Sequence, residues 1–207
     1  MLKNVIYFVL SIVLFFFGMI VYGVILNSAE ITLAEAMRSK GFETLENVNI
    51  IIERSKYSLN LYSDTTLVKS YKVVFGKNEK LKKSRANDHA TPVGEYRICE
   101  IDTANIYYKF LKLNYPNEKD ASEALQNGII DRSEFIAITQ AQKKGDCSPS
   151  DTNLGANIGI QGIGKYNAIF KNLPFIFNWT NGSIALSNEN IDELYSVVEL
   201  GTKVVIK

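Results

Sequence analysis

The strongest constraint on this chain is an uncharged apolar run near its start, residues 5–26 (VIYFVLSIVLFFFGMIVYGVIL). Coiled as a helix at about 1.5 Å per residue, these 22 residues are long enough for the roughly 30 Å hydrocarbon core of a bilayer. A secretory signal has a shorter apolar region, of about 7–15 residues, before a small-x-small cleavage site. Here the run ends in the poor site Leu26-Asn27-Ser28-Ala29. We therefore predict an uncleaved membrane anchor, with a cleaved signal peptide as the alternative.

Few charges indicate which way the anchor crosses. Lys3 and the α-amino group precede the run, whereas Glu30 and Glu35 are the first charges after it. Because positive charge favours the cytoplasmic side, residues 1–4 are expected in the cytoplasm and the rest of the chain outside the membrane.

The overall charge excludes one class of partner. The chain has 23 basic and 22 acidic residues, a net charge of +1, which gives no general footprint for nucleic acid. No histidine, cysteine and carboxylate cluster has ligand spacing, so neither a metal nor a cofactor is expected. Cys99 and Cys147 permit one disulfide if the domain lies outside the cytoplasm. Two separate thiols fit equally well, and the sequence leaves both possibilities open.

The pattern after the anchor predicts one mainly β domain with a few helices. Residues 27–47 form a spacer with a short helix over 32–41 that stops at a glycine, and the domain covers 48–207. Short runs with β-type composition predict strands at 48–53, 57–61, 67–75, 96–101, 110–115, 157–160 and 202–206. Helices are predicted at 120–126, 132–143 and 188–200, the last with Asn188 as its N-cap.

A series of landmarks then follows in a characteristic order. The chain carries YSLNLY (57–62), YKVVFG (71–76), Asp88 with TPVGEY (91–96), LNYPN (113–117) with Asp120, LGANIGIQGIG (154–164), NWTNGSIALSNENIDEL (178–194) and GTKVVIK (201–207). This order resembles the catalytic domain of bacterial L,D-transpeptidases, the YkuD-like family, over nearly everything after the anchor.

The resemblance implies a fold and a chemistry. Family members have a mixed β-sandwich with a cysteine nucleophile in a shallow groove. They cut the L-to-D bond after the third residue of a peptidoglycan stem peptide, and the acyl group passes to an amine or to water. An anchor with the domain outside, on the periplasmic face of a bacterial inner or cytoplasmic membrane, suits that substrate.

The chain departs from the family motif at the positions that carry the chemistry. A histidine-glycine pair of the family corresponds here to Gln161-Gly162. The later histidine-glycine-cysteine run corresponds to Asn181-Gly182-Ser183, and the following arginine position holds Ala185. The glycines remain, while both histidines, the cysteine and the arginine are replaced.

These replacements predict an impaired catalyst. A cysteine has a pKa near 8.5 that a neighbouring imidazole can lower, whereas a serine hydroxyl needs a positioned base. The amides of Gln161 and Asn181 cannot take a proton near pH 7, and Ala185 offers no charge to a substrate carboxylate. Ser183 is therefore interpreted as the relic of a nucleophile. The Asn181-Gly182 turn would still aim backbone N–H groups at an oxyanion.

Three residues are candidates for a surrogate role. His89, the only histidine, would be a base; Cys147 would be a relocated nucleophile; and Lys165 would be a base if its pKa were strongly depressed. For each of them an ordinary loop residue is the simpler interpretation.

Aromatic residues give a further hypothesis, that of a glycan- or peptide-binding groove. Such side chains also pack in a β-sandwich core, so each has two interpretations. Trp179 and Thr180, beside the altered motif, are predicted to bind substrate. The other aromatic candidates are Tyr107, Tyr108, Tyr115, Phe175 and Phe177.

The sequence thus predicts a membrane-anchored protein that acts at peptidoglycan stem peptides in cell-wall biogenesis without forming crosslinks itself. It would bind stem peptides or pair with an active cell-wall enzyme. The alternative is an active L,D-transpeptidase or L,D-carboxypeptidase that uses Ser183 or a surrogate, and a structural envelope protein is a third possibility.

Overall fold

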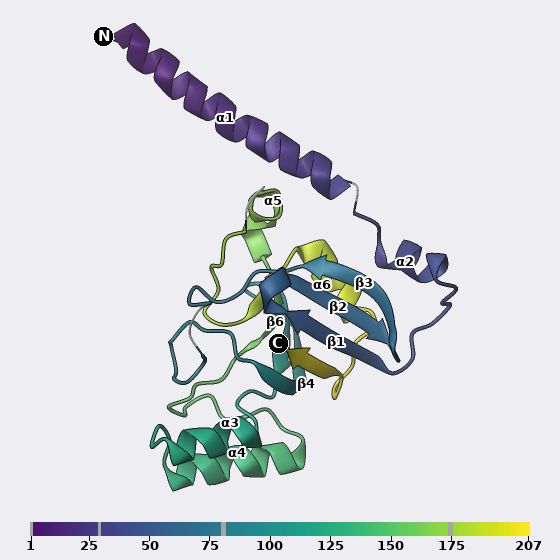
Figure 1. The fold of residues 1–207 in the computed structure, drawn as a ribbon, viewed down its shortest axis with the longest axis vertical. Helices are drawn as coiled ribbons and strands as arrows, with labels where there is room; N and C mark the ends of the chain where they lie inside the picture. Colours follow the sequence, from purple (N-terminus) through teal and green to yellow (C-terminus); the bar gives the residue numbers. More distant parts are fainter. Residues whose placement is uncertain (1, 29, 80–81, 174–175) are drawn as a thin grey trace.

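The computed structural model describes residues 2–28, 30–79, 82–173 and 176–207. The chain begins with helix α1 (Leu2–Ser28), which projects from one end of a β-rich domain (Figure 1). Within α1, Leu2–Ile25 is long and apolar enough to cross a membrane, a test that a signal sequence also passes. The helix extends beyond the predicted run 5–26 at both ends.

An eight-stranded mixed sheet forms the domain, as the predicted fold class requires. The strand order is β3-β2-β1-β8-β4-β5-β6-β7, with parallel pairing of β1 to β8 and of β6 to β7. The strands are β1 (Val48–Glu53), β2 (Ser58–Ser63), β3 (Thr66–Lys72), β4 (Gly94–Asn105), β5 (Tyr108–Leu113), β6 (Gly159–Gly162), β7 (Ile184–Leu186) and β8 (Lys203–Ile206). Strand β7, with only three residues, is absent from the predicted strands.

The sheet folds back on itself through its longest strand. The first part of β4, Gly94–Arg97, pairs with β8, and its later part pairs with β5, with register shifts along the way. Beyond β3, the chain returns to the opposite end of the sheet, where Val74 and Gly76 form bridges with Ala185 and Thr180. The two ends of the sheet therefore meet around one core that includes Ile50, Leu61, Tyr96, Leu111, Ile160 and Ile184.

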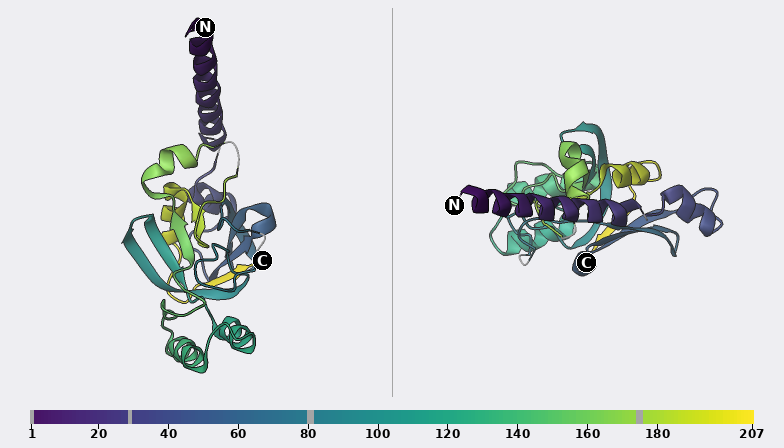
Figure 2. Two further views of the ribbon diagram at one scale, coloured as in Figure 1. Left: turned by 90° about the vertical axis from the view of Figure 1, so that its left-hand side faces the viewer. Right: turned by 90° about the horizontal axis from the view of Figure 1, so that it is seen from above.

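A helical hairpin lies at the end of the domain away from α1 (Figures 1 and 2). It consists of α3 (Glu118–Gln126) and α4 (Arg132–Lys144), each opened by a capping box, at Asn117 and Asp131. A disulfide joins Cys99 of β4 to Cys147 just after α4, with 5.3 Å between the two Cα atoms. The two cysteines are thus bonded to each other and are not separate thiols. Their disulfide attaches the hairpin to the sheet.

The remaining helices are short. They are α2 (Leu33–Ser39), α5 (Asn167–Phe170) and α6 (Asn188–Tyr195), with 3-10 turns at Arg54–Lys56 and Gly164–Tyr166. A capping box at Thr32 opens α2, whose Leu33 and Ala36 are buried. Helix α2 therefore packs on the domain.

Helix α6 differs from its prediction at both ends. Its N-cap is Ser187, whose hydroxyl accepts a hydrogen bond from the Asn190 N–H at 3.2 Å, so the predicted cap Asn188 is wrong. Ser187 has the extended backbone that a cap needs, whereas Asn188 already lies in the first turn. The helix ends at Tyr195 rather than Leu200 because turns take over, including one in which the Val197 N–H bonds to the Leu194 carbonyl.

Candidate functional site

A groove of about 630 Å³ lies where β6, the 179–183 segment and the β4–β5 hairpin approach one another. Among the predicted site residues, it is lined by Gln161, Trp179, Thr180, Asn181 and Ser183. Residues far apart in the sequence are thus brought together at one hollow, which also includes Asn157, Ile158, Tyr107 and Phe110.

The strand register explains why these side chains share a face. In the parallel pair of β6 and β7, Ile160 lies opposite Ile184 and Gln161 opposite Ala185. Side chains alternate between the two faces of a sheet. Because the two isoleucines are fully buried in the core, Gln161 and Ala185 face the other way, as does Ser183 immediately before β7.

Ser183 is held firmly in place. Its side chain is buried, and its hydroxyl oxygen accepts a hydrogen bond from the Gly159 N–H at 3.3 Å. Its carbonyl accepts a hydrogen bond from the Thr180 hydroxyl at 2.5 Å. No histidine and no cysteine is among the described residues that line the groove. Two hydrogen bonds therefore hold Ser183, in a groove whose described lining contains no imidazole.

The turn before Ser183 requires glycine. Gly182 has φ +119°, and a Cβ there would lie 2.7 Å from the Ala90 carbonyl oxygen and 2.8 Å from Ile158 Cδ1. Its N–H donates to the Thr180 hydroxyl at 3.2 Å. This N–H is therefore already engaged within the turn, which conflicts with the idea that it points at an oxyanion. Thr180, predicted to bind substrate, uses its hydroxyl to close the same turn.

Ala185 and Gly162 lie at crowded positions outside the groove lining. Ala185 is 1% exposed and exchanges two backbone hydrogen bonds with Val74, both 2.9 Å long. It borders a second hollow, of about 420 Å³, and Trp179 lines both hollows. A Cβ on Gly162 would lie 2.7 Å from the Tyr107 carbonyl oxygen and 2.8 Å from Asn188 Oδ1. The glycine thus allows β6 to pass beside the β4–β5 turn.

Of the three surrogate candidates, one is excluded by its bonding and the other two lie outside the groove lining. Cys147 is bonded to Cys99, so the hypothesis of a relocated thiol nucleophile is wrong. His89 is absent from the described residues that line the groove. Lys165 is likewise absent from that lining, and its ammonium lies 4.9 Å from the centre of the Tyr166 ring.

Carboxylates at the groove are already paired. Asp102 accepts hydrogen bonds from the Asn105 amide and the Ala104 N–H, both 2.9 Å long. The Asn105 hydrogen bond, followed by the backbone one, lowers the pKa of Asp102. Glu100 forms an ion pair with Lys112 at 3.2 Å. A carboxylate with a lowered pKa is a poor general base at neutral pH, so Asp102 is not suited to activate a hydroxyl.

The aromatic candidates divide between groove and core. Tyr107 and Trp179 line the groove, with their ring centres 5.9 Å apart. Tyr115 is buried in the core, and the Tyr108 hydroxyl donates to Asp192 at 3.0 Å. Phe177 lines the second hollow. Phe175 lies outside the described residues.

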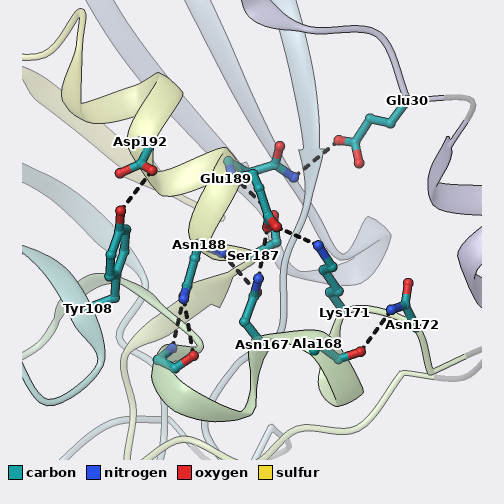
Figure 3. Close-up of polar contacts among 12 residues, drawn as sticks. Glu30, Tyr108, Asn167, Ala168, Lys171, Asn172, Ser187, Asn188, Glu189 and Asp192 are labelled. Atoms are coloured by element: carbon teal, nitrogen blue, oxygen red, sulfur yellow. Dashed lines mark hydrogen bonds and ion pairs between the residues drawn. The ribbon is translucent and has the colours of Figure 1, made fainter.

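Sequence reasoning missed a polar network that fixes the segment after β6 (Figure 3). Asn188 accepts a hydrogen bond from the Gly164 N–H and donates to its carbonyl, at 2.9 and 3.1 Å. Asn167 accepts from the Asn188 N–H and donates to Glu189, both at 2.9 Å, and Lys171 pairs with Glu189. Burial alone would raise the pKa of Glu189, but the Lys171 and Asn167 hydrogen bonds lower it to about 2. The acidic start of α6 was visible in the sequence, but its partners were not.

Comparison with known proteins gives a consistent match. The sequence matches the model of the L,D-transpeptidase catalytic domain, YkuD, over residues 47–206. No curated protein matches it significantly.

The solved structures that resemble the chain have low sequence identity. An L,D-transpeptidase from Xylanimonas cellulosilytica is 13% identical, with a TM-score of 0.46 over 84% of this chain and 68% of that one. A mutant of the helical cell shape determining protein Pgp2 from Campylobacter jejuni is 17% identical, with a TM-score of 0.50 over 77% of this chain and 46% of that one. L,D-transpeptidase 3 from Mycobacterium tuberculosis is 13% identical, with a TM-score of 0.46 over 80% of this chain and 63% of that one. The chain thus spans less than half of the Pgp2 structure.

Proposed function

The chain belongs to the L,D-transpeptidase catalytic-domain family, which acts on peptidoglycan, and from this premise we propose that it binds stem peptides as a membrane-anchored, catalytically impaired member. Residues 1–4 would lie in the cytoplasm, 5–26 in the membrane, and 27–47 would lead to the domain of residues 48–207. The protein would bind peptidoglycan itself or pair with an active cell-wall enzyme.

One observation carries the proposal of impaired catalysis. Both cysteines of the chain are joined in a single disulfide, so the protein has no thiol to act as a nucleophile. A disulfide sulfur is not a thiolate, and the thiolate is the reactive form of cysteine. The position that carries the family's cysteine holds Ser183, whose hydroxyl has no imidazole among the described groove residues. A serine without a positioned base is a weak nucleophile.

The groove supports retained binding. Its volume of about 630 Å³ falls within the range of small-ligand sites, roughly 300–1,000 Å³. Trp179 and Tyr107 supply apolar surface, and the amides of Gln161, Asn157 and Asn181 supply hydrogen-bonding groups suited to a peptide. Gly182 and Gly162 allow the tight backbone approach that shapes this groove.

The extracytoplasmic location has two independent supports. The α1 helix is long and apolar enough to cross a membrane. The Cys99–Cys147 disulfide belongs to an oxidising compartment, since the cytosol keeps most thiols reduced. Both fit a domain that faces the cell wall.

The first prediction concerns turnover. The full chain in detergent, incubated with tetrapeptide-rich peptidoglycan, is expected to produce neither 3-3 crosslinks nor trimmed stem peptides. Mass spectrometry of the released muropeptides checks this. An acylating β-lactam is expected to leave no mass adduct on Ser183 because no base activates its hydroxyl.

Two variants make this result informative. One carries Gln161→His with Ser183→Cys, which places an imidazole and a thiol at the groove, and the other adds Asn181→His and Ala185→Arg. Because Ala185 is fully buried, the shorter variant is the fairer test of the groove. An adduct or product that forms with either variant but not with the unmodified chain supports the proposal. Product from the unmodified chain, lost on Ser183→Ala, would instead establish an active serine enzyme.

The second prediction concerns binding. Asn181 is exposed and lines the groove, so Asn181→Tyr should obstruct it without disturbing the core. Co-sedimentation with purified sacculi is expected to weaken about ten-fold, equivalent to about 1.4 kcal/mol. The matched control is Asn127→Tyr, at an equally exposed position on the α3–α4 hairpin. Equal binding by both variants, or no binding by the unmodified chain, would contradict the proposed groove.

A further inference from the structure

Four large apolar side chains are exposed on the part of the chain that connects β6 to Trp179. Tyr166, Ile169, Ile176 and Phe177 are between 51% and 57% exposed. We call them the apolar patch. The catalytic motifs do not use it, and neither does the groove. Exposed apolar side chains gathered on one segment often mark a contact with another surface.

The patch lies next to the end of the membrane helix. Gly23 of α1 approaches the domain so closely that a Cβ there would lie 1.8 Å from the Asn172 carbonyl oxygen. The lining of the second hollow includes Gly23 and Ile31 together with Leu173, Ile176 and Phe177. Figures 1 and 2 show α5, which carries Ile169, directly beside the last turns of α1.

The chain makes contacts with the domain soon after the end of α1. Helix α1 ends at Ser28, and Glu30 already accepts a hydrogen bond from the Asn190 amide at 3.1 Å. The Leu33 N–H donates to Glu193 at 2.9 Å, and the Leu33 side chain is buried in the core. The chain therefore enters the domain from α1 on the same face of the domain that carries the patch.

The patch is also held in shape. The network in Figure 3 ties Gly164, Asn167 and Lys171 to the first turn of α6. Trp179 packs against Phe170 with ring centres 6.0 Å apart, which supports α5 from the groove side. Tyr166 and Ile169 consequently lie on a backbone segment that these contacts hold in place.

We propose that the apolar patch is a lipid-contact surface that enters the outer boundary of the bilayer spanned by α1. This inference rests on the anchoring part of the proposed function. Gly23 falls within the apolar window Leu2–Ile25, so backbone packed against it lies at the depth where hydrocarbon meets headgroups. Tyrosine and tryptophan rings favour that boundary, and the patch contains Tyr166. Lys165, stacked on the Tyr166 ring, can extend its ammonium to the lipid headgroups.

Tryptophan quenching by lipid tests the proposal in the full chain, which has one tryptophan. The reporter is Trp179→Phe with Ile169→Trp, and the matched control is Trp179→Phe with Ile136→Trp. Ile136 is 43% exposed on α4, at the end of the domain away from α1. Each is reconstituted into vesicles of phosphatidylcholine and phosphatidylglycerol, with and without brominated acyl chains. Bromines about 5–10 Å below the headgroups should remove roughly half of the reporter's emission and leave the control unchanged.

A second measurement needs no substitution. The unmodified chain is reconstituted with a lipid that carries a photoactivatable group near the top of its acyl chain. After illumination, mass spectrometry is expected to find lipid adducts on Tyr166 or Ile169 and none on the α3–α4 hairpin. This result would hold even if a tryptophan variant failed to fold.

The outcomes separate this inference from the proposed function. Flotation of the chain with vesicles establishes the anchor. Quenching and adducts confined to the patch support the inference. A chain that floats with an unquenched reporter and no adducts overturns the inference and leaves the anchor in place. Adducts replaced by crosslinks between two copies of the chain would overturn it in favour of a dimer contact. A chain that does not float overturns the anchor and this inference together, while the sacculus and muropeptide results stand.

Discussion

Replacing Asp88 with asparagine is expected to lower the free energy of unfolding by about 3 kcal/mol, because the change leaves the Lys83 ammonium buried without a counter-charge. The two side chains form an ion pair at 2.7 Å and are only 4% and 13% exposed. Urea unfolding followed by circular dichroism, with the shift in midpoint multiplied by the slope, measures the loss.

The size of this effect follows from how much Asp88 organises. Besides Lys83, its carboxylate accepts hydrogen bonds from the backbone N–H groups of Ser84, Arg85 and Ala90, at 2.8 to 3.0 Å. The Ala90 carbonyl in turn packs against Gly182 at the groove. One carboxylate therefore holds a whole loop against the turn that carries Ser183.

The same carboxylate predicts a pH dependence. Burial alone would raise the pKa of Asp88, but the hydrogen bonds from Lys83 and the three N–H groups outweigh it and hold the pKa below 3.8. A group whose pKa is depressed on folding stabilises the fold fully above its unfolded pKa. Its contribution is lost as the pH falls through the folded pKa. The unmodified domain should lose this stability only below about pH 4, whereas the asparagine variant should lack it at every pH.

Two controls isolate the buried charge. Glu123→Gln removes the partner of Lys82 in an ion pair that is largely exposed, and it should cost less than about 1 kcal/mol. The double variant Lys83→Met with Asp88→Asn removes both charges and should regain part of the stability lost by Asp88→Asn. Equal losses of unfolding free energy from Asp88→Asn and Glu123→Gln would show that the Lys83–Asp88 pair does not stabilise the fold more than an exposed pair.

Removing the disulfide is expected to lower the free energy of unfolding by a similar amount. Replacing Cys99 and Cys147 together by serine releases a connection with a sequence separation of 48. Loop-closure entropy for that separation corresponds to about 4 kcal/mol at 25 °C. The loop contains the α3–α4 hairpin, whose small cluster around Ile138, Ala121 and Leu154 is separate from the main core. The hairpin should therefore lose protection first.

Thermal unfolding and amide hydrogen exchange measure the two parts of this expectation. The serine variant should melt at a lower temperature, with faster exchange over residues 118–144 than over β1 and β8. A reducing agent should lower the melting temperature of the unmodified chain and leave that of the serine variant unchanged. A variant that melts like the unmodified chain would mean that the hairpin is held by its own packing.

Much of the fold could be predicted because local patterns agree with it. The apolar run before Asn27, the alternation in β2 and the signals around α3 and α4 reflect interactions within a few residues. The short β7 could not be found in this way, since three residues carry no period. Its pairing with β6 and with Val74 depends on contacts across the whole domain.

The sequence named five residues that the structure brings to one groove, but it did not give their geometry. The register pairs Gln161 with Ala185, and Ser183 shares their face because side chains alternate along the strand. The motif did not reveal that Ala185 borders a different hollow, nor that Thr180 occupies the Gly182 N–H. The place of Ala185 depends on backbone hydrogen bonds with Val74, which lies far away in the sequence. The Thr180 hydrogen bond is local, but the residue types alone do not specify its geometry.

The place of β8 has a consequence for biogenesis. This late strand inserts between β1 and β4, pairing Ile50 and Tyr96 with the same residue, Val204. In the proposed topology the β1–β3 meander and the β4–β5 hairpin cross the membrane before β8, and their facing edges are then unpaired. Open strand edges are templates for pairing with other chains. In that topology the polypeptide is vulnerable to misassembly until β8 has crossed, and a nascent chain that stalls before residue 203 leaves the sheet in two halves.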